Sequence, residues 1–189
     1  SAQAERIRAA GEAAGLPIHY FKRSRTLPRV EWALGLLRGM RPGSLLDIGS
    51  GRGTFLWPLL DAFPHLPVTA VDADSRRAEL LAAAQAGGME RLTARLADAT
   101  SLPFDDRSFD VVTFLEVLEH IPDAERALAE GVRVCERALL ITVPSRPDDN
   151  PEHIHLFDED RLRQMLAACG VSRVKCAGVS GHLTILAQK

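Results

Sequence analysis

Two periodicities alternate along this chain. Short apolar runs, which are typical of buried strands, recur at about 44–49, 67–72, 91–97, 109–115 and 138–143. Between them, apolar residues at helical spacing predict helices from Pro28 to Pro42, from near Arg52, and at about 75–86, 123–135 and 158–169. Two further strand-like runs close the chain, at 172–178 and 182–188, with Ser180 and Gly181 between them as a hairpin turn.

Strands that alternate with helices predict a parallel sheet covered by helices on both faces. We therefore expect an α/β fold with three layers, built on a doubly wound seven-stranded sheet. Five strands should be parallel, and the C-terminal hairpin should add one antiparallel strand. The 189 residues contain no repeat and no low-complexity linker. We expect one such domain at 28–189, preceded at 1–27 by a helical and irregular cap segment.

The most distinctive local pattern follows the first strand. Its apolar run ends in Asp47, and glycines follow at the alternate positions 49, 51 and 53. Clustered glycines permit positive φ angles or a close approach of backbone to a ligand. The spacing departs from the Gly-x-Gly-x-x-Gly of dinucleotide sites. A carboxylate there repels a pyrophosphate but suits a cofactor with a sulfonium and an ammonium group, so the loop predicts such a cofactor.

Composition narrows the function only slightly. No apolar run approaches the length of a membrane span, and no secretory signal is evident. Cys135, Cys169 and Cys176 are scattered, which favours buried free thiols in a cytoplasmic protein. Residues 1–43 carry eight Lys or Arg against three Glu. This basic segment is either a solvated helical face or a surface for an anionic substrate or nucleic acid.

Five motifs in register resemble those of the class I S-adenosylmethionine-dependent methyltransferases. They are Leu45–Gly53, Val68–Asp74, Leu96–Leu102, Phe109–His120 and Ile141–Pro144. Phe157 to Gly170 also resembles the late helix of that family, and the match covers about residues 28–189. The resemblance implies a Rossmann-like fold, S-adenosyl-L-methionine as methyl donor and S-adenosyl-L-homocysteine as product.

The resemblance also implies which residues hold the donor at the carboxyl ends of the strands. Asp47 would lie beneath the cationic part of the cofactor, and Asp72 would accept hydrogen bonds from the ribose hydroxyls. Asp98 would accept from the adenine amino group. The full set of expected cofactor-binding residues is Asp47, Gly49, Ser50, Gly51, Gly53, Asp72, Ala73, Asp98, Ala99, Leu115 and Glu116.

Methyl transfer from a sulfonium is an in-line displacement, so the protein supplies mainly proximity and alignment. A base is needed only where the acceptor must lose a proton. Glu116 and His120 are the catalytic candidates, since a carboxylate and an imidazole are common bases near neutral pH. A structural histidine at a helix start is the alternative for His120.

We expect no metal, but one alternative is a metal site at Glu116, Glu119, His120 and His155. The first three stand at i, i+3 and i+4, which predicts one helix face, and His153 and His155 follow the fifth strand. Carboxylates and imidazoles suit a divalent cation. The pattern is similar to that of metal-dependent small-RNA 2′-O-methyltransferases. The chain departs from it, with no paired histidines after Glu119 and no Trp in the later motif.

Three functions are therefore open. The leading one is methyl transfer to a small-molecule acceptor. An RNA methyltransferase, with or without a metal, is favoured by Lys22, Arg23, Arg25 and Arg29, and would bind nucleic acid in a salt-dependent way. The third is a non-catalytic module that binds S-adenosylmethionine. The sequence does not predict the oligomeric state.

Overall fold

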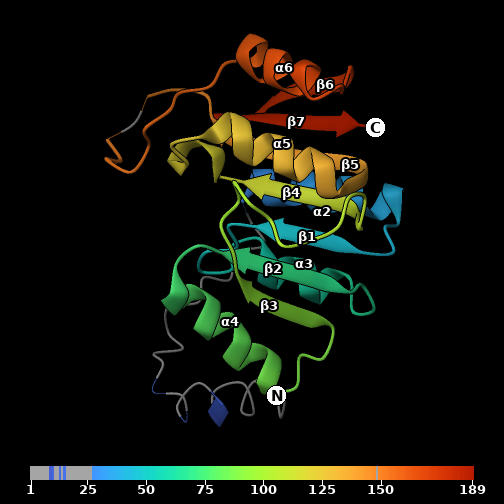
Figure 1. Ribbon diagram of the computed structural model, residues 1–189, viewed down its shortest axis with the longest axis vertical. Coiled ribbons are helices and arrows are strands. Elements are labelled where there is room, and N and C mark those ends of the chain that lie inside the picture. The colour runs from blue at the N-terminus through green and yellow to red at the C-terminus, as the bar shows by residue number, and fades with distance from the viewer. Residues whose placement is uncertain (1–8, 11–12, 14, 16–26, 148) are drawn as a thin grey trace.

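The computed structural model describes residues 9–10, 13, 15, 27–147 and 149–189 (Figure 1). Most of the expected cap at 1–27 lies outside these residues. The elements, in chain order, are α2 (Pro28–Met40), β1 (Leu45–Ile48), α3 (Leu56–Ala62), β2 (Val68–Asp72), α4 (Ser75–Ala86), β3 (Leu92–Leu96), β4 (Phe109–Leu115), the short 3₁₀ helix η2 (Leu118–His120), α5 (Ala124–Val134), β5 (Cys135–Pro144), α6 (Glu159–Ala168), β6 (Arg173–Val179) and β7 (His182–Gln188).

All seven strands form one sheet in the order β3-β2-β1-β4-β5-β7-β6. The pairs among β1 to β5 are parallel, and β7 runs antiparallel to both β5 and β6. The predicted fold is thus confirmed. The chain order reverses between β1 and β4, and ligands of doubly wound sheets bind at the carboxyl ends of the strands beside such a switch point.

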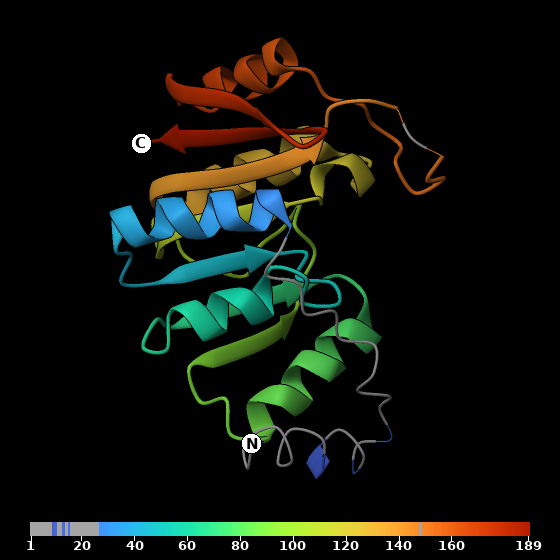
Figure 2. The same ribbon diagram turned by 180° about the vertical axis from the view of Figure 1, so that it is seen from behind.

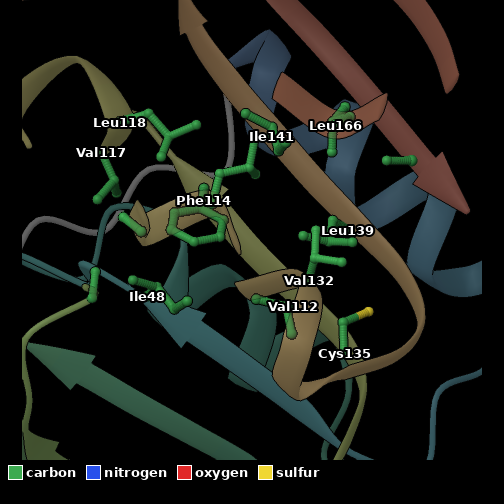
Figure 3. Close-up of a cluster of buried hydrophobic side chains, with 14 of the residues drawn as sticks. Ile48, Val112, Phe114, Val117, Leu118, Val132, Cys135, Leu139, Ile141 and Leu166 are labelled. Atoms are coloured by element: carbon green, nitrogen blue, oxygen red, sulfur yellow. The ribbon is translucent and has the colours of Figure 1, made fainter. Parts of the chain in front are cut away.

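Two apolar cores lie on opposite faces of the sheet. Side chains of α5 and α6 pack on one face with alternate residues of β1, β4 and β5, and the helices lie in front of the sheet in Figure 1. Figure 3 shows part of this core, with Phe114 of β4 at its centre. Side chains of α2, α3 and α4 pack on the other face, and α2 and α3 lie in front in Figure 2. Burial on both faces explains the nearly continuous apolar runs of the parallel strands.

Local signals place most helix ends. Pro28 occupies the first turn of α2, where proline costs no hydrogen bond. Asp74 and Asp158 accept backbone N–H groups at the N-termini of α4 and α6. The helix expected from near Arg52 instead begins at Leu56, because the preceding loop holds glycines at positive φ. Pro58 therefore lies in its first turn. Within the described part of the chain, no helix is long and apolar enough to cross a membrane.

Candidate functional site

A cavity opens at the carboxyl end of β1, beside the switch point. It contains about 580 Å³ of space between protein atoms, part of it open to solvent. Six predicted cofactor-binding residues line it: Asp47, Gly49, Ser50, Gly51, Leu115 and Glu116. Residues that the motifs did not single out also line it, among them Arg29, Thr54 and Phe55. The sequence pattern and the cavity therefore coincide at β1 and at the end of β4.

Asp47 is a buried carboxylate at the base of this cavity. Its side chain is 2% exposed and accepts hydrogen bonds of 2.7 Å from Ser50 Oγ and from Thr113 Oγ1. Asp47 and Thr113 are register partners on β1 and β4. Burial raises the pKa of Asp47 from 3.8 to about 6, although both hydroxyl donors lower it, and the nearby charge of Asp72 adds to the rise. A cation in the cavity would offset the free-energy cost of ionising the buried Asp47 carboxylate.

The glycine loop has the conformation that its sequence predicts. Gly49, Gly51 and Gly53 all have positive φ. A Cβ on Gly49 would clash with Val117, and one on Gly53 with Trp57. A Cβ on Gly51 would meet only Gly49 O, at 3.7 Å, so its backbone faces open space in the cavity. At Gly51 the loop thus presents bare backbone to the cavity, which suits a site for a small cofactor.

Asp72 connects the second strand to this loop. It is 5% exposed, and its two carboxylate oxygens accept from the backbone N–H groups of Gly51 (2.8 Å) and Asp74 (3.0 Å). Each oxygen keeps a further lone pair. Asp72 therefore fixes the loop and retains acceptor capacity at the end of β2, where the ribose was expected.

Five of the expected residues do not line the cavity: Gly53, Asp72, Ala73, Asp98 and Ala99. Ala73 is exposed beside Asp72. Asp98 is exposed and accepts from Thr100 N and Oγ1, both at 2.8 Å. These bonds lower the pKa of Asp98. Ala99 belongs to the core beneath α5. The predicted adenine contacts of Asp98 and Ala99 stay predictions.

Glu116 joins a polar network at the rim. It has a φ of 62°, a strained conformation for a residue with a side chain. Its Oε1 accepts from Thr142 Oγ1 at 2.8 Å. Its Oε2 lies 2.9 Å from His182 Nε2 and 3.7 Å from Arg29 Nε. The motifs did not indicate His182, although it begins β7 opposite Pro144, at the carboxyl end of β5.

The expected helix face of Glu116, Glu119 and His120 is wrong. Only Leu118–His120 is helical, since the positive φ of Glu116 turns the chain before it. Glu119, His120 and His153 instead form one cluster, whose ligand atoms lie within 4.8 Å of one another. His155 Nε2 lies 3.0 Å from Ile121 O. Of the proposed metal quartet, the structure brings together Glu119 and His120 and leaves the other two outside.

The described residues include only part of the basic segment at 1–43. Lys22, Arg23 and Arg25 lie outside the described residues. Arg29 is described, and it lines the cavity beside Glu116.

Comparison with known proteins agrees with the geometry. Residues 46–139 match a family described as "Methyltransferase domain". The chain is 30% identical, over 170 residues, to a malonyl-[acyl-carrier protein] O-methyltransferase of Geobacter sulfurreducens, covering 77% of this chain and 62% of the relative. It is 28% identical, over 190 residues, to a demethylmenaquinone methyltransferase of Renibacterium salmoninarum, covering 82% and 76%.

A solved structure shares the fold. A SAM-dependent methyltransferase of Aquifex aeolicus aligns with a TM-score of 0.68 at 20% identity, over 84% of this chain and 88% of that one. The chain spans about three fifths of the Geobacter relative's length.

Proposed function

Because this chain belongs to the class I S-adenosylmethionine-dependent methyltransferases, we propose that it transfers the donor's methyl group to a small-molecule acceptor. The observation that carries the proposal is the cavity, in which bare glycine backbone lies beside a buried carboxylate. The relatives in the comparison are named as methyltransferases of malonyl-[acyl-carrier protein] and of demethylmenaquinone, and neither name refers to RNA. We therefore favour a small acceptor over RNA.

The residues present fit the donor. Gly51 leaves space where a side chain would stand, Asp72 keeps acceptor capacity at the end of β2, and Asp47 places a carboxylate where a cationic group would sit. When bound, S-adenosylmethionine supplies a methyl group on a sulfonium, which is an excellent leaving group. The chain's own task is then to bind, to align and to exclude water.

Asp47 supplies the negative charge that complements the positive charge of the donor. Its ionised form is unfavourable in the buried site, as the raised pKa shows, so a cationic ligand stabilises it. The hydroxyls of Ser50 and Thr113 hold its two oxygens in place. Recognition of the donor thereby includes its positive charge.

Glu116 is the residue that we propose for the acceptor side. It lines the cavity and is partly exposed, and Thr142 and His182 hold its carboxylate oxygens. The atom that would receive the methyl group from the bound donor is an oxygen, a nitrogen or a carbon of the acceptor. Where that acceptor atom carries a proton, Glu116 can accept it directly or through water. His120 does not line the cavity and instead contacts Glu152 O.

Calorimetry with S-adenosylhomocysteine tests the cofactor part of this proposal. Wild-type protein should bind in the micromolar range, and Asp72→Asn should bind at least tenfold more weakly. Asp74→Asn is the matched control, because the Asp74 carboxylate caps α4, whereas the Asp72 carboxylate holds the backbone of Gly51 in the cavity lining. Absence of binding in the wild type would refute the proposal.

Transfer of a labelled methyl group to metabolite and RNA pools tests the acceptor. Label in a small molecule, with a kcat that Glu116→Gln lowers at saturating cofactor, is the expected result. Label in RNA, with binding that weakens steeply with salt, would instead support the nucleic-acid alternative. Cofactor binding without label in either pool would indicate a module that does not catalyse transfer.

A further inference from the structure

A second constellation of chemically active side chains lies outside the cavity lining. Glu119, His120 and His153 each offer one ligand atom, and these atoms lie within 4.8 Å of one another. Glu119 is fully buried, whereas both histidines are partly exposed. One carboxylate oxygen and two imidazole nitrogens are a donor set that divalent first-row transition metals bind in proteins.

His120 makes a hydrogen bond of the kind that metal-binding histidines usually make. Its Nδ1 lies 2.9 Å from the carbonyl oxygen of Glu152. A carbonyl only accepts, so this contact requires the proton on Nδ1 and leaves the lone pair on Nε2. Metal-binding histidines typically donate their second ring nitrogen to a carbonyl or carboxylate in this way, which fixes the tautomer and the ring orientation.

The backbone holds the third ligand near the other two. Ile154 N and His155 N both donate to Glu119 O, at 2.9 and 3.2 Å. The rings of His120 and His153 stack edge to face, with centroids 4.8 Å apart. The segment that carries His153 is therefore bound to the turn that carries Glu119, although the two lie far apart in the sequence.

We propose that Glu119, His120 and His153 bind one divalent transition-metal ion, with water in the remaining coordination positions. Ligand atoms around a tetrahedral Zn²⁺ lie about 3.4 Å apart, given bonds of about 2.1 Å. The atoms of the cluster lie up to 4.8 Å apart, so metal binding would draw the two partly exposed histidine side chains closer to the buried Glu119. The ion ties residues 150–155 to the turn after β4. This proposal does not depend on methyl transfer.

Metal titration of the purified full chain, after treatment with a chelator, tests the site. Calorimetry with Zn²⁺ should give one ion per chain with micromolar or tighter affinity, and Co²⁺ should give the visible absorption of a site with nitrogen ligands. His120→Ala and His153→Ala should each weaken binding at least tenfold. Both positions are partly exposed, so these variants should fold, and they keep the buried Glu119 itself.

Two control variants sharpen the result. His65→Ala removes an exposed histidine remote in sequence and should leave the affinity unchanged. His155→Gln should retain binding, since its Nε2 contacts the carbonyl oxygens of Ile121 and Pro122. Urea unfolding of each variant checks that it folds. Absence of a one-to-one complex, or equal binding by the wild type and the two alanine variants, would overturn the proposal. Loss of S-adenosylhomocysteine binding alone would not affect it.

Discussion

The buried carboxylate of Asp47 makes stability depend on pH. Its pKa rises from 3.8 to about 6 on folding, mainly because of burial. At 1.36 kcal/mol per pKa unit, the ionised carboxylate costs the folded protein about 3 kcal/mol without a ligand. Below about pH 4 the group is protonated in both states and costs nothing. Between about pH 4 and 6 the folded state keeps the proton that the unfolded state has lost, so stability falls as pH rises.

Asp47→Asn removes the titration while keeping the shape. The hydroxyls of Ser50 and Thr113 can accept as well as donate hydrogen bonds, so the amide retains both partners. Relative to the wild type, the variant should gain about 3 kcal/mol of unfolding free energy between pH 4 and pH 7. Its affinity for S-adenosylmethionine should fall at least tenfold at pH 7, since the cation loses its counter-charge.

Urea unfolding of cofactor-free protein, followed by fluorescence of the two tryptophans, measures the difference at each pH. Carboxylates with lowered pKa values, such as Asp98 and Glu130, make the unfolding free energy rise with pH in the acid range. They contribute equally to the wild type and to Asp47→Asn, so the difference between the two proteins isolates Asp47. Asp105→Asn, at an exposed position, controls for the removal of a charge. A stability difference that is independent of pH would refute the reasoning about burial.

Glycine substitutions separate packing from backbone conformation. Gly131→Ala places a methyl against the ring of Phe114 and should lower the free energy of unfolding by about 1–3 kcal/mol. Gly35→Ala, exposed in α2 with no heavy atom within 4 Å of the new methyl, should raise it by about 0.5–1 kcal/mol. Urea midpoints check both, and a Gly131→Ala variant as stable as the wild type would contradict the packing. Gly51→Ala, at a φ of 54°, should cost about 1–2 kcal/mol and weaken S-adenosylhomocysteine binding at least tenfold by calorimetry; unchanged affinity would show that the loop does not contact the ligand.

Local patterns sufficed wherever a residue's role depends on its neighbours in the chain. The apolar runs and helical spacings predicted all seven strands and the helices between them. A helix that buries one face repeats its apolar residues every three or four positions, and a strand buried on both faces gives a continuous apolar run. Asp47 and the three glycines were found in the same way, since they follow one strand directly. The start of α3 was misplaced because the glycine turn extends further than periodicity indicates.

The partners of the functional side chains could not be read from such patterns. A motif suggested that Glu116 shares a helix face with Glu119, yet the positive φ of Glu116 directs its carboxylate toward Thr142 and His182 instead. Similarly, the spacing of His153 and His155 does not tell which ring reaches Glu119. Hydrogen bonds from the backbone of residues 154 and 155 to Glu119 decide that.

The sequence by itself determined the order of the elements, the glycine loop beside the cavity and the carboxylate at its base, because each depends on a continuous stretch of chain. Only the tertiary structure decided that His182 supports Glu116 and that His153 joins Glu119 and His120. Those contacts join distant segments, and they follow from the antiparallel register of β7 on β5 and from the anchoring of residues 150–155. The register of β7 and the position of residues 150–155 form only when the whole sheet packs. Short-range periodicity in the sequence therefore does not predict them.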